Sequence, residues 1–255
     1  LASAVIPTNA PLGEGIFDGC SGLMQVTLPE NMTKVPNYMF RGCKSLRSID
    51  LPDALTAIGQ AAFRNCSDLQ EFNIPENVTT ISSEALRGCS GLEYLVIPDK
   101  VTRISDYTLE GAGIETLVIG AGVTNFATKN NVPAGLKEFV VSEQNTTYAA
   151  YDGVLYNKEM TTILYVPYGL DRHIEIAEGV TQINGEFYLR KKFTGVSLPK
   201  SLTYISASEF TYCEALEYVS VHEDNTFYAS LDGILYTKDY TQFHTIPKKL
   251  RILFF

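Results

Sequence analysis

Hydrophobic positions recur along this chain at a constant step. An aliphatic residue followed by proline marks this step at Leu28-Pro29, Leu51-Pro52, Ile74-Pro75 and Ile97-Pro98. Other apolar columns keep the same phase, at Phe17, Phe40, Phe63 and Leu86, and at Leu23, Leu46, Leu69 and Leu92. The step becomes slightly shorter at Ile119 and Val141, and the pattern returns at Ile176, Leu198 and Val221. Such a period predicts a repeat protein built from stacked units.

Each unit follows the pattern L-x-x-I-x-L-P-x-x-V-T-x-I-x-x-x-A-F-x-x-C. Its first part predicts a short strand with Leu46, Ile49 and Leu51 pointing inward. The proline ends this strand because it has no N–H to donate. A second short extended segment follows, and residues 60–63 predict one turn of helix that carries the chain back. Because one unit cannot bury its own apolar side, the units stack around a continuous core.

The stacked units predict a repeat solenoid of the α/β to mainly β class, with a parallel sheet on its concave face. Nine strands are expected between Leu28 and Val221, and a tenth begins at Leu1. Neighbouring strands would lie ~4.8 Å apart. The crossover rule for parallel strands predicts a right-handed solenoid, with short helical turns on the return side.

Two segments interrupt the period and match each other when they are aligned, 143–170 and 223–250. Their shared residues are Asn145 and Asn225, Asp152 and Asp232, Gly153 and Gly233, Tyr156 and Tyr236, and Pro167 and Pro247. Each segment holds two apolar runs around a polar turn, which predicts a β-hairpin insert. The expected plan is coils in 1–141, a hairpin insert in 142–173, coils in 174–221, and a second insert with a truncated strand in 222–255. These parts would form one continuous solenoid domain.

Both ends of the chain fall inside expected strands, at Leu1 and at residues 251–255. A solenoid needs polar terminal caps because an end coil exposes its apolar core. Two interpretations remain open: the chain is a fragment of a longer protein, or residues 1–13 fold back as an irregular cap.

Composition narrows the function classes. The chain of 255 residues is 45% hydrophobic and 19% charged, which predicts a folded rather than a disordered protein. Its net charge of −9 argues against nucleic acid as the main partner, because phosphate binding needs a basic surface. No run approaches the ~18 apolar residues of a membrane helix.

The cysteines Cys20, Cys43, Cys66 and Cys89 keep the repeat step, and Cys213 has the same phase in a later coil. None forms the close pair typical of zinc sites. Stacked coils would hold their Cβ atoms about 4.8 Å apart, farther than the ~3.8 Å of a disulfide. The pattern therefore favours buried free thiols that act as small apolar side chains.

Catalytic and metal-binding motifs find little support. His173, His222 and His244 follow no metal-ligand spacing, and each lies at a junction with a hairpin segment. Asp152-Gly153 and Asp232-Gly233 lack the pattern of a calcium loop, and we interpret them as turn pairs. No Ser/His/Asp set is indicated by spacing, and no cofactor is expected.

The repeat resembles the BspA-like subclass of leucine-rich repeats. The clearest matches are "IPENVTTISSEALRGC" (74–89) and "LPDALTAIGQAAFRNC" (51–66), each beside an L-x-x-L-x-L strand. Family members are typically surface or secreted proteins of host-associated bacteria and some protozoa, and several act in adhesion. The resemblance implies an extracellular or cell-surface location and an adhesive role. It also implies that the hairpin inserts belong to the architecture.

The outward strand positions are the candidate binding surface, because repeat proteins usually bind through their concave face. These positions are polar, lean acidic and carry tyrosines, which offer contact area at low entropic cost. The candidate residues are Glu71, Glu93, Tyr94, Glu115, Glu138, Glu217 and Tyr218.

Three hypotheses for function follow. The first is a non-enzymatic, monomeric adhesion module for a protein or glycan partner, such as host extracellular matrix. The second is a structural spacer or stalk of a larger surface protein, with no ligand of its own. The third is an enzyme, which would need a pocket with convergent titratable groups.

Overall fold

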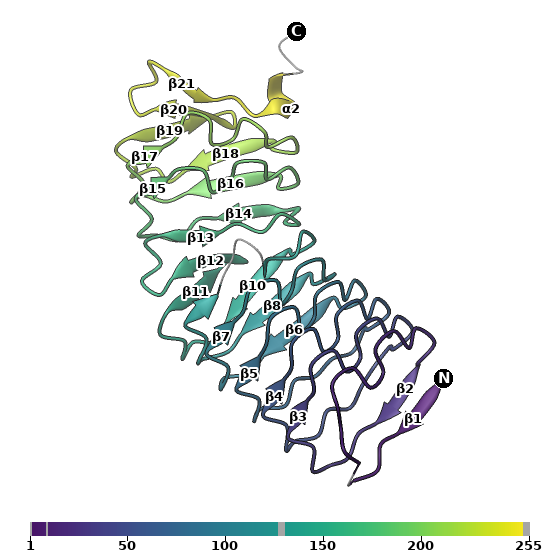
Figure 1. The fold of residues 1–255 in the computed structure, drawn as a ribbon. Helices are drawn as coiled ribbons and strands as arrows, with labels where there is room; N and C mark the ends of the chain where they lie inside the picture. Colours follow the sequence, from purple (N-terminus) through teal and green to yellow (C-terminus); the bar gives the residue numbers. More distant parts are fainter. Residues whose placement is uncertain (1, 9, 127–130, 252–255) are drawn as a thin grey trace. The chain divides into compact units, whose positions relative to one another are not determined.

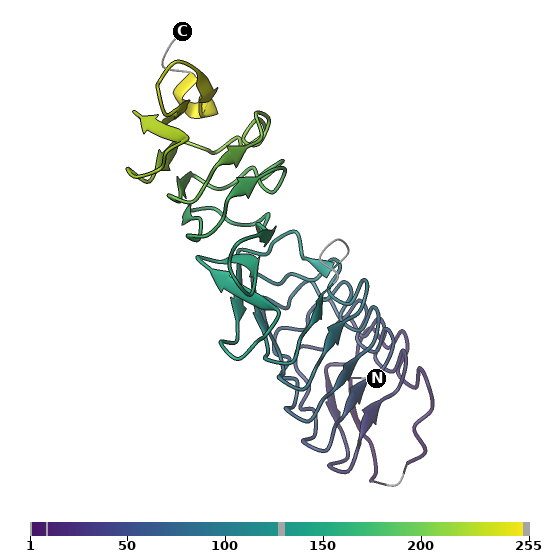
Figure 2. The same cartoon turned by 90° about the vertical axis from the view of Figure 1, so that its left-hand side faces the viewer.

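The structure, a computed structural model, describes residues 2–8, 10–126 and 131–251. Leu1 and residues 252–255, where the two cut strands were expected, lie outside the described residues. The chain divides into two compact units, residues 1–136 with 140–146, and residues 137–139 with 147–255. Within each unit the backbone forms coils stacked in chain order (Figures 1 and 2). The segment boundaries expected from the sequence stay predictions.

A continuous parallel sheet runs through unit 1. Its five short strands are β3 (Lys34–Val35), β4 (Ala57–Ile58), β5 (Thr80–Ile81), β7 (Arg103–Ile104) and β9 (Asn125–Phe126). In every strand the second residue is buried, whereas the first is exposed or half-buried. This alternation is expected of a sheet with one face on the core. The second extended segment of the repeat is therefore confirmed.

The strands of the first extended segment form shorter groups. They are β1 (Ser3–Val5) paired with β2 (Gln25–Thr27), β6 (Tyr94–Ile97) paired with β8 (Thr116–Ile119), and β10 (Glu138–Val141). In the two coils between β2 and β6, the first extended segment forms only an isolated bridge, which joins Ser48 to Glu71. Two of the nine expected strands are therefore absent from residues 10–126, and the parallel sheet is interrupted there.

In unit 1, the third residue of each expected strand differs between coils with and without a strand. Val96 and Val118 hold this outward position in the strands that form. Asp50 and Asn73 hold it in the two coils without strands. Asp and Asn are depleted in strands, whereas β-branched residues favour them.

Between Gly15 and Gly111 the return side of unit 1 contains turns where helical turns were expected. Two columns of residues have positive φ, Gly15, Tyr38, Ala61, Glu84 and Tyr107, and Gly19, Gly42, Asn65, Gly88 and Gly111. A right-handed helix requires negative φ at every residue, so the two left-handed residues in each of these five coils exclude a helix there. The turns are instead bonded between coils, as in Phe40 N–H to the Ala62 carbonyl at 2.8 Å and Phe63 N–H to the Ala85 carbonyl at 2.9 Å.

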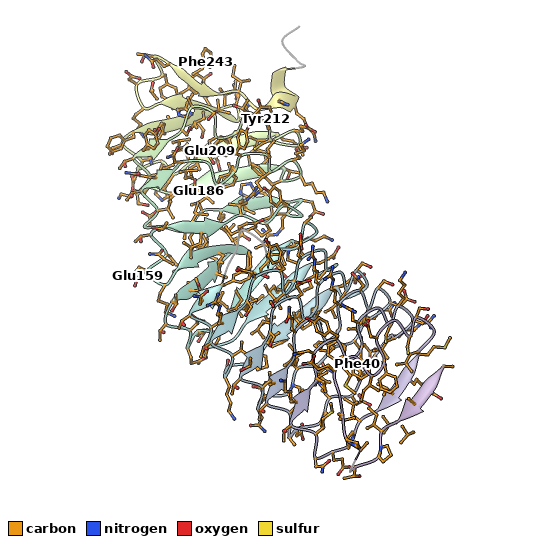
Figure 3. The ribbon with its side chains drawn as sticks, viewed as in Figure 1. Phe40, Glu159, Glu186, Glu209, Tyr212 and Phe243 are labelled. Atoms are coloured by element: carbon orange, nitrogen blue, oxygen red, sulfur yellow. The ribbon has the colours of Figure 1, made fainter. Side chains whose placement is uncertain are left out.

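Aromatic side chains fill the core behind these turns. The rings of Phe17 and Phe40 stack with centroids 5.6 Å apart, and those of Phe40 and Phe63 with centroids 5.3 Å apart. Phe72 meets Phe63 edge-on at 4.8 Å. Phe40 lies among the coils of unit 1 in Figure 3 and has no exposed surface. Burying one such side chain contributes roughly 1.5–3 kcal/mol, so the periodic phenylalanine column stabilises the stack.

Unit 2 combines parallel and antiparallel sheets. The parallel strands are β14 (His173–Glu175), β16 (Gly195–Leu198) and β18 (Tyr218–Val221), with β15 (Gln182–Ile183) paired to β17 (Tyr204–Ile205). The antiparallel strands are β11 (Tyr148–Tyr151), β12 (Val154–Asn157) and β13 (Ile163–Tyr165), and β19 (Tyr228–Leu231), β20 (Ile234–Thr237) and β21 (Phe243–Thr245). A short helix, α2 (Lys248–Arg251), follows. Each segment expected to hold two strands therefore holds three.

A buried asparagine explains part of the match between residues 143–170 and 223–250. Asn225 Nδ2 donates to the carbonyls of Pro199 and Leu202 at 2.9 and 2.8 Å. Its Oδ1 accepts the N–H groups of Phe227 and Tyr228, both at 2.8 Å. Asn145 likewise donates to two carbonyls of the preceding coil. Each amide satisfies buried backbone groups where a coil turns into antiparallel strands.

The two antiparallel sheets differ in how far they are covered. Tyr156 is fully buried, and its hydroxyl accepts the Ala177 N–H at 3.3 Å. Its counterpart Tyr236 is half-buried. Ile163 is buried, whereas its counterpart Phe243 is 65% exposed at the edge of β21 (Figure 3). The shared sequence pattern therefore forms a covered sheet in residues 143–170 and a sheet with an exposed apolar surface in residues 223–250.

Candidate functional site

Four of the seven candidate residues lie in unit 1, beside the interruption of its sheet. Glu71 forms the isolated bridge with Ser48, and Tyr94 opens β6 with its side chain 57% exposed. Glu93 is exposed just before β6, and its carbonyl accepts the Glu115 N–H at 2.8 Å. Glu115 itself is half-buried. Glu71 and Tyr94 are the pair that the structure brings to one place.

That place is a hollow of about 490 Å³ where the sheet is interrupted. Glu71 and Asn73 line one side, and Tyr94 and Val96 of β6 line the other. A second hollow, of about 600 Å³, occupies the other interruption, between β2 and Arg47. Each of these two hollows therefore lies at a gap across which no strand pairing is present in the described residues.

The turn side of unit 1 offers paired charges instead. Arg64 Nη1 lies 2.6 Å from Glu84 Oε2, and Arg87 Nη2 lies 2.7 Å from Glu110 Oε2. Arg41 pairs with Asp18 in the same way. Exposed pairs of this kind contribute about 0–1 kcal/mol each to stability. Their charges largely satisfy one another, so this side is a weaker candidate for ligand binding than the acidic strand face.

The other three candidates lie in unit 2 and do not form one site. Glu138 is half-buried in β10. Glu217 Oε1 lies 2.5 Å from Lys249 Nζ in an ion pair. The Tyr218 ring stacks on His173, with ring centroids 5.1 Å apart and an angle of 10° between the planes. Glu217 is therefore partly neutralised, and Tyr218 belongs to a different cluster.

The absence of a side chain at Gly195 leaves room for the His173 and Tyr218 rings to stack. The register places His173 beside Gly195 and Gly195 beside Tyr218, on three neighbouring strands. A Cβ atom at Gly195 would lie 2.7 Å from His173 Nδ1 and 2.8 Å from the Tyr218 ring. Without that atom, the two rings meet above the middle strand. His173, Gly195 and Tyr218 follow one another at the step of the repeat, but that step alone does not show that the two rings stack.

A chain of hydrogen bonds leads away from His173. Its Nε2 lies 2.9 Å from Ser197 Oγ, which lies 2.7 Å from Ser220 Oγ. Ser220 donates to the Val196 carbonyl at 3.4 Å. Because that carbonyl can only accept, Ser197 donates to Ser220, and His173 Nε2–H donates to Ser197.

Tyr151 and Glu175 complete the cluster beside these serines. The Tyr151 hydroxyl donates to Glu175 Oε2 at 2.9 Å, and this bond raises the pKa of Tyr151. The Glu175 N–H donates to Asp152 Oδ2 at 2.6 Å, and Arg172 Nη1 lies 2.5 Å from Asp152 Oδ1. The sequence does show one signal of this arrangement, because Glu175, Ser197 and Ser220 follow one another at the step of the repeat.

The Asp-Gly pairs act as turns. Asp152 and Gly153 have φ values of 48° and 80°, and Asp232 and Gly233 have values of 51° and 79°. Both pairs link antiparallel strands. The interpretation of these pairs as turn residues is confirmed. No group of three or more His, Cys, Asp or Glu side chains within residues 2–8, 10–126 and 131–251 is arranged to hold a metal ion.

The cysteines are free, and four of the five are buried. Each buried thiol donates to a phenylalanine carbonyl of the preceding coil: Cys43 to Phe17, Cys66 to Phe40, Cys89 to Phe63 and Cys213 to Phe187. Burial raises the pKa of Cys43, Cys89 and Cys213 to about 12 and raises that of Cys66 as well. The expected buried free thiols are confirmed at these four positions, and such protonated thiols are poor nucleophiles.

A family model described as the BspA type leucine rich repeat region matches residues 2–130 and 171–249, with six copies. The chain belongs to the BspA-type leucine-rich repeat family. This confirms the resemblance that the repeat motifs indicated. Leucine-rich repeats of this family and fold are generally non-enzymatic. No curated protein matches the chain.

Solved bacterial structures share the fold of this BspA-type chain. A leucine-rich repeat protein from Eubacterium ventriosum has a TM-score of 0.59 at 21% identity, over 86% of this chain and 66% of that one. A leucine rich cell surface protein from Faecalibacterium prausnitzii has a TM-score of 0.56 at 22% identity, over 86% and 69%. A leucine-rich repeat protein from Bacteroides ovatus has a TM-score of 0.55 at 23% identity, over 87% and 55%.

These comparisons limit what can be transferred. The chain spans 66% of the first of these structures and 55% of the third. At these identities the likeness shows the solenoid fold alone. Among the residues that the structure describes, no helix is long and apolar enough to cross a membrane.

Proposed function

We propose that this chain is a non-enzymatic binding module, at the cell surface or outside the cell, which holds a protein or glycan partner on its outward strand positions. Host extracellular matrix is the first partner to test, because the family resemblance implies an adhesive role. The module acts as a monomer and needs no cofactor.

The hollow between Glu71 and Tyr94 is the observation that carries this proposal. It places an exposed tyrosine, a carboxylate and the amide of Asn73 around about 490 Å³. Tyrosine contributes a large rigid contact area, and the polar groups supply hydrogen bonds that fix a partner's orientation. The buried residues of the coils hold these side chains on a packed scaffold, which lowers the entropic cost of binding.

The electrostatics support a partner with a basic or hydroxyl-rich surface. Glu71, Glu76 and Glu93 are exposed beside this hollow, in a chain with a net charge of −9. An acidic face attracts a complementary surface and repels an acidic one. The proposal of a non-enzymatic role rests on the family to which the chain belongs.

Charge reversal on the strand face tests where the partner binds. Glu71→Lys and Glu93→Lys should each weaken binding to a matrix protein or glycan by about tenfold, measured by surface plasmon resonance. Asp106→Lys is the matched control, because Asp106 is an exposed acid in the turn region of the repeat. It should leave the affinity within about twofold.

Equal losses in all three variants would contradict binding through the strand face. Circular dichroism of each variant should match that of the native chain, so that a loss reflects the surface and not the fold. A folded native chain that binds no partner in the screen would favour the spacer function instead.

A further inference from the structure

We propose that a third hollow, on the strand face of unit 2, binds a sugar residue of a neutral carbohydrate chain. The hollow measures about 360 Å³, and its lining includes Tyr151, Glu175, Ser197 and Ser220. This volume falls in the range of small-ligand sites, roughly 300–1,000 Å³. The inference deepens the proposed binding function and rests on it.

The two serines present hydrogen-bond acceptors. Each hydroxyl has one proton and two lone pairs. Ser197 uses its proton toward Ser220 and one lone pair toward His173. Ser220 uses its proton toward the Val196 carbonyl and one lone pair toward Ser197. Each oxygen keeps one lone pair for a ligand, and both atoms are fixed in place by their neighbours.

Glu175 adds a carboxylate whose position is fixed by hydrogen bonds. Tyr151 binds its Oε2 at 2.9 Å, and the Asp152 carboxylate binds its backbone N–H at 2.6 Å. Asp152 is in turn fixed by Arg172 through its Oδ1. A carboxylate with fixed orientation forms strong hydrogen bonds to hydroxyl donors, and it loses little freedom when it does so.

The lining excludes an anionic ligand. Neither Lys nor Arg is among the described residues that line the hollow, whereas Glu175 and Glu178 are. His222 also lines it, and its Nδ1 accepts the Asp224 N–H at 3.2 Å, as a neutral imidazole does. A phosphate, sulfate or sialic acid would therefore meet carboxylates without a compensating cation. The ligand must be rich in hydrogen-bond donors and uncharged or cationic.

Apolar groups favour a sugar over a simple amine. Leu198, Pro199 and Val221 line the same hollow as the polar groups, and the Tyr151 ring is 41% exposed beside Glu175. A pyranose ring presents C–H groups on one face and hydroxyls at its rim, so it satisfies both kinds of lining. The negative face of an aromatic ring attracts such polarised C–H groups. A lysine ammonium has three donors and can use the same polar groups, but it offers no ring face of C–H groups to cover the apolar lining.

Saturation-transfer difference NMR tests this site with defined probes. The purified chain is mixed in turn with lactose, cellobiose, maltose, N,N′-diacetylchitobiose, 3′-sialyllactose and acetyl-Lys-Lys-amide. We expect saturation transfer to at least one neutral disaccharide and none to 3′-sialyllactose. Glu175→Gln should weaken that binding about tenfold, and Ser220→Ala about three- to fivefold.

Ser208→Ala is the matched control, because Ser208 is exposed in unit 2 and does not line this hollow. It should leave binding unchanged. Transfer to the lysine peptide but to no disaccharide would overturn the inference in favour of an amine site. Disaccharide binding that resists Glu175→Gln but is lost in Glu71→Lys would also overturn it, while leaving the proposed function intact. Absence of any partner, in this experiment and in the matrix screen, would contradict both.

Discussion

Gly88 shows how one position of the repeat restricts the residue that can occupy it. Its φ is +72°, and an added Cβ would collide with the Asn65 side chain of the preceding coil. Gly42 has a φ of +74°, but there the nearest atom to an added Cβ is Gly19 Cα at 3.6 Å. Both positions need glycine for the backbone, and Gly88 needs it for space as well.

We therefore predict that Gly42→Ala destabilises the fold by about 1–2 kcal/mol. Gly88→Ala should cost about 1 kcal/mol more, because Asn65 must also move. In an Asn65→Gly background this extra cost should disappear, since the colliding amide is gone. Urea denaturation of the four variants, read as a double-mutant cycle, measures the difference. Equal effects at Gly42 and Gly88 would contradict the close contact.

At the scale of elements, the sequence indicated the repeat and its inward columns but not where strands would form. The inward columns can be predicted from hydrophobicity alone, because their periodicity is visible directly in the sequence. Strand formation also depends on outward positions such as Asp50 and Asn73, whose low strand preference leaves no mark on the hydrophobic pattern. The turns were mistaken for helix because residues such as Ala61 and Glu84 favour helices, although they adopt positive φ here.

Part of the candidate site could also be predicted from the sequence, because some of its residues belong to periodic outward columns. Outward columns gave Glu71 and Tyr94, which do share a hollow. The His173–Tyr218 stack depends on what Gly195 lacks, and a missing side chain leaves no periodic signal. The right-handed winding expected from the crossover rule stays a prediction.

Replacing the outward residues tests this explanation of the broken sheet. The double variant Asp50→Val with Asn73→Val should extend strand pairing across the interruption and raise stability by about 0.5–1 kcal/mol. Far-ultraviolet circular dichroism and urea denaturation measure the two effects. Val96→Asp is the reciprocal variant and should weaken β6 and lower stability by a similar amount. Unchanged circular dichroism in both directions would contradict the role of these positions.

At the scale of the whole molecule, buried protonated groups make stability depend on alkaline pH. Burial raises the pKa of Cys43, Cys89 and Cys213 from 9.0 to about 12, and that of Tyr165 from 10.0 to about 12. Between about pH 9 and 12 the folded chain therefore binds more protons than the unfolded chain. Stability should fall as pH rises through this window, because unfolding releases those protons.

Urea midpoints at pH 8, 9, 10 and 11 measure this dependence. Each fully shifted group contributes a slope of up to about 1.4 kcal/mol per pH unit. Cys89→Ala removes one such group and should flatten the slope between pH 9 and 11. A stability that stays constant from pH 8 to pH 11 would show that these groups are not buried as described.

The function of the whole chain depends on whether its strand faces are occupied by a partner or only separate other parts of a protein. The most direct measurement is a binding isotherm of the purified, folded chain against immobilised matrix proteins and a glycan array. Saturable binding to at least one of them, reduced by Glu71→Lys but not by Asp106→Lys, is the result that the account predicts. Linear, unsaturable signals that are the same for native chain and variants would contradict it.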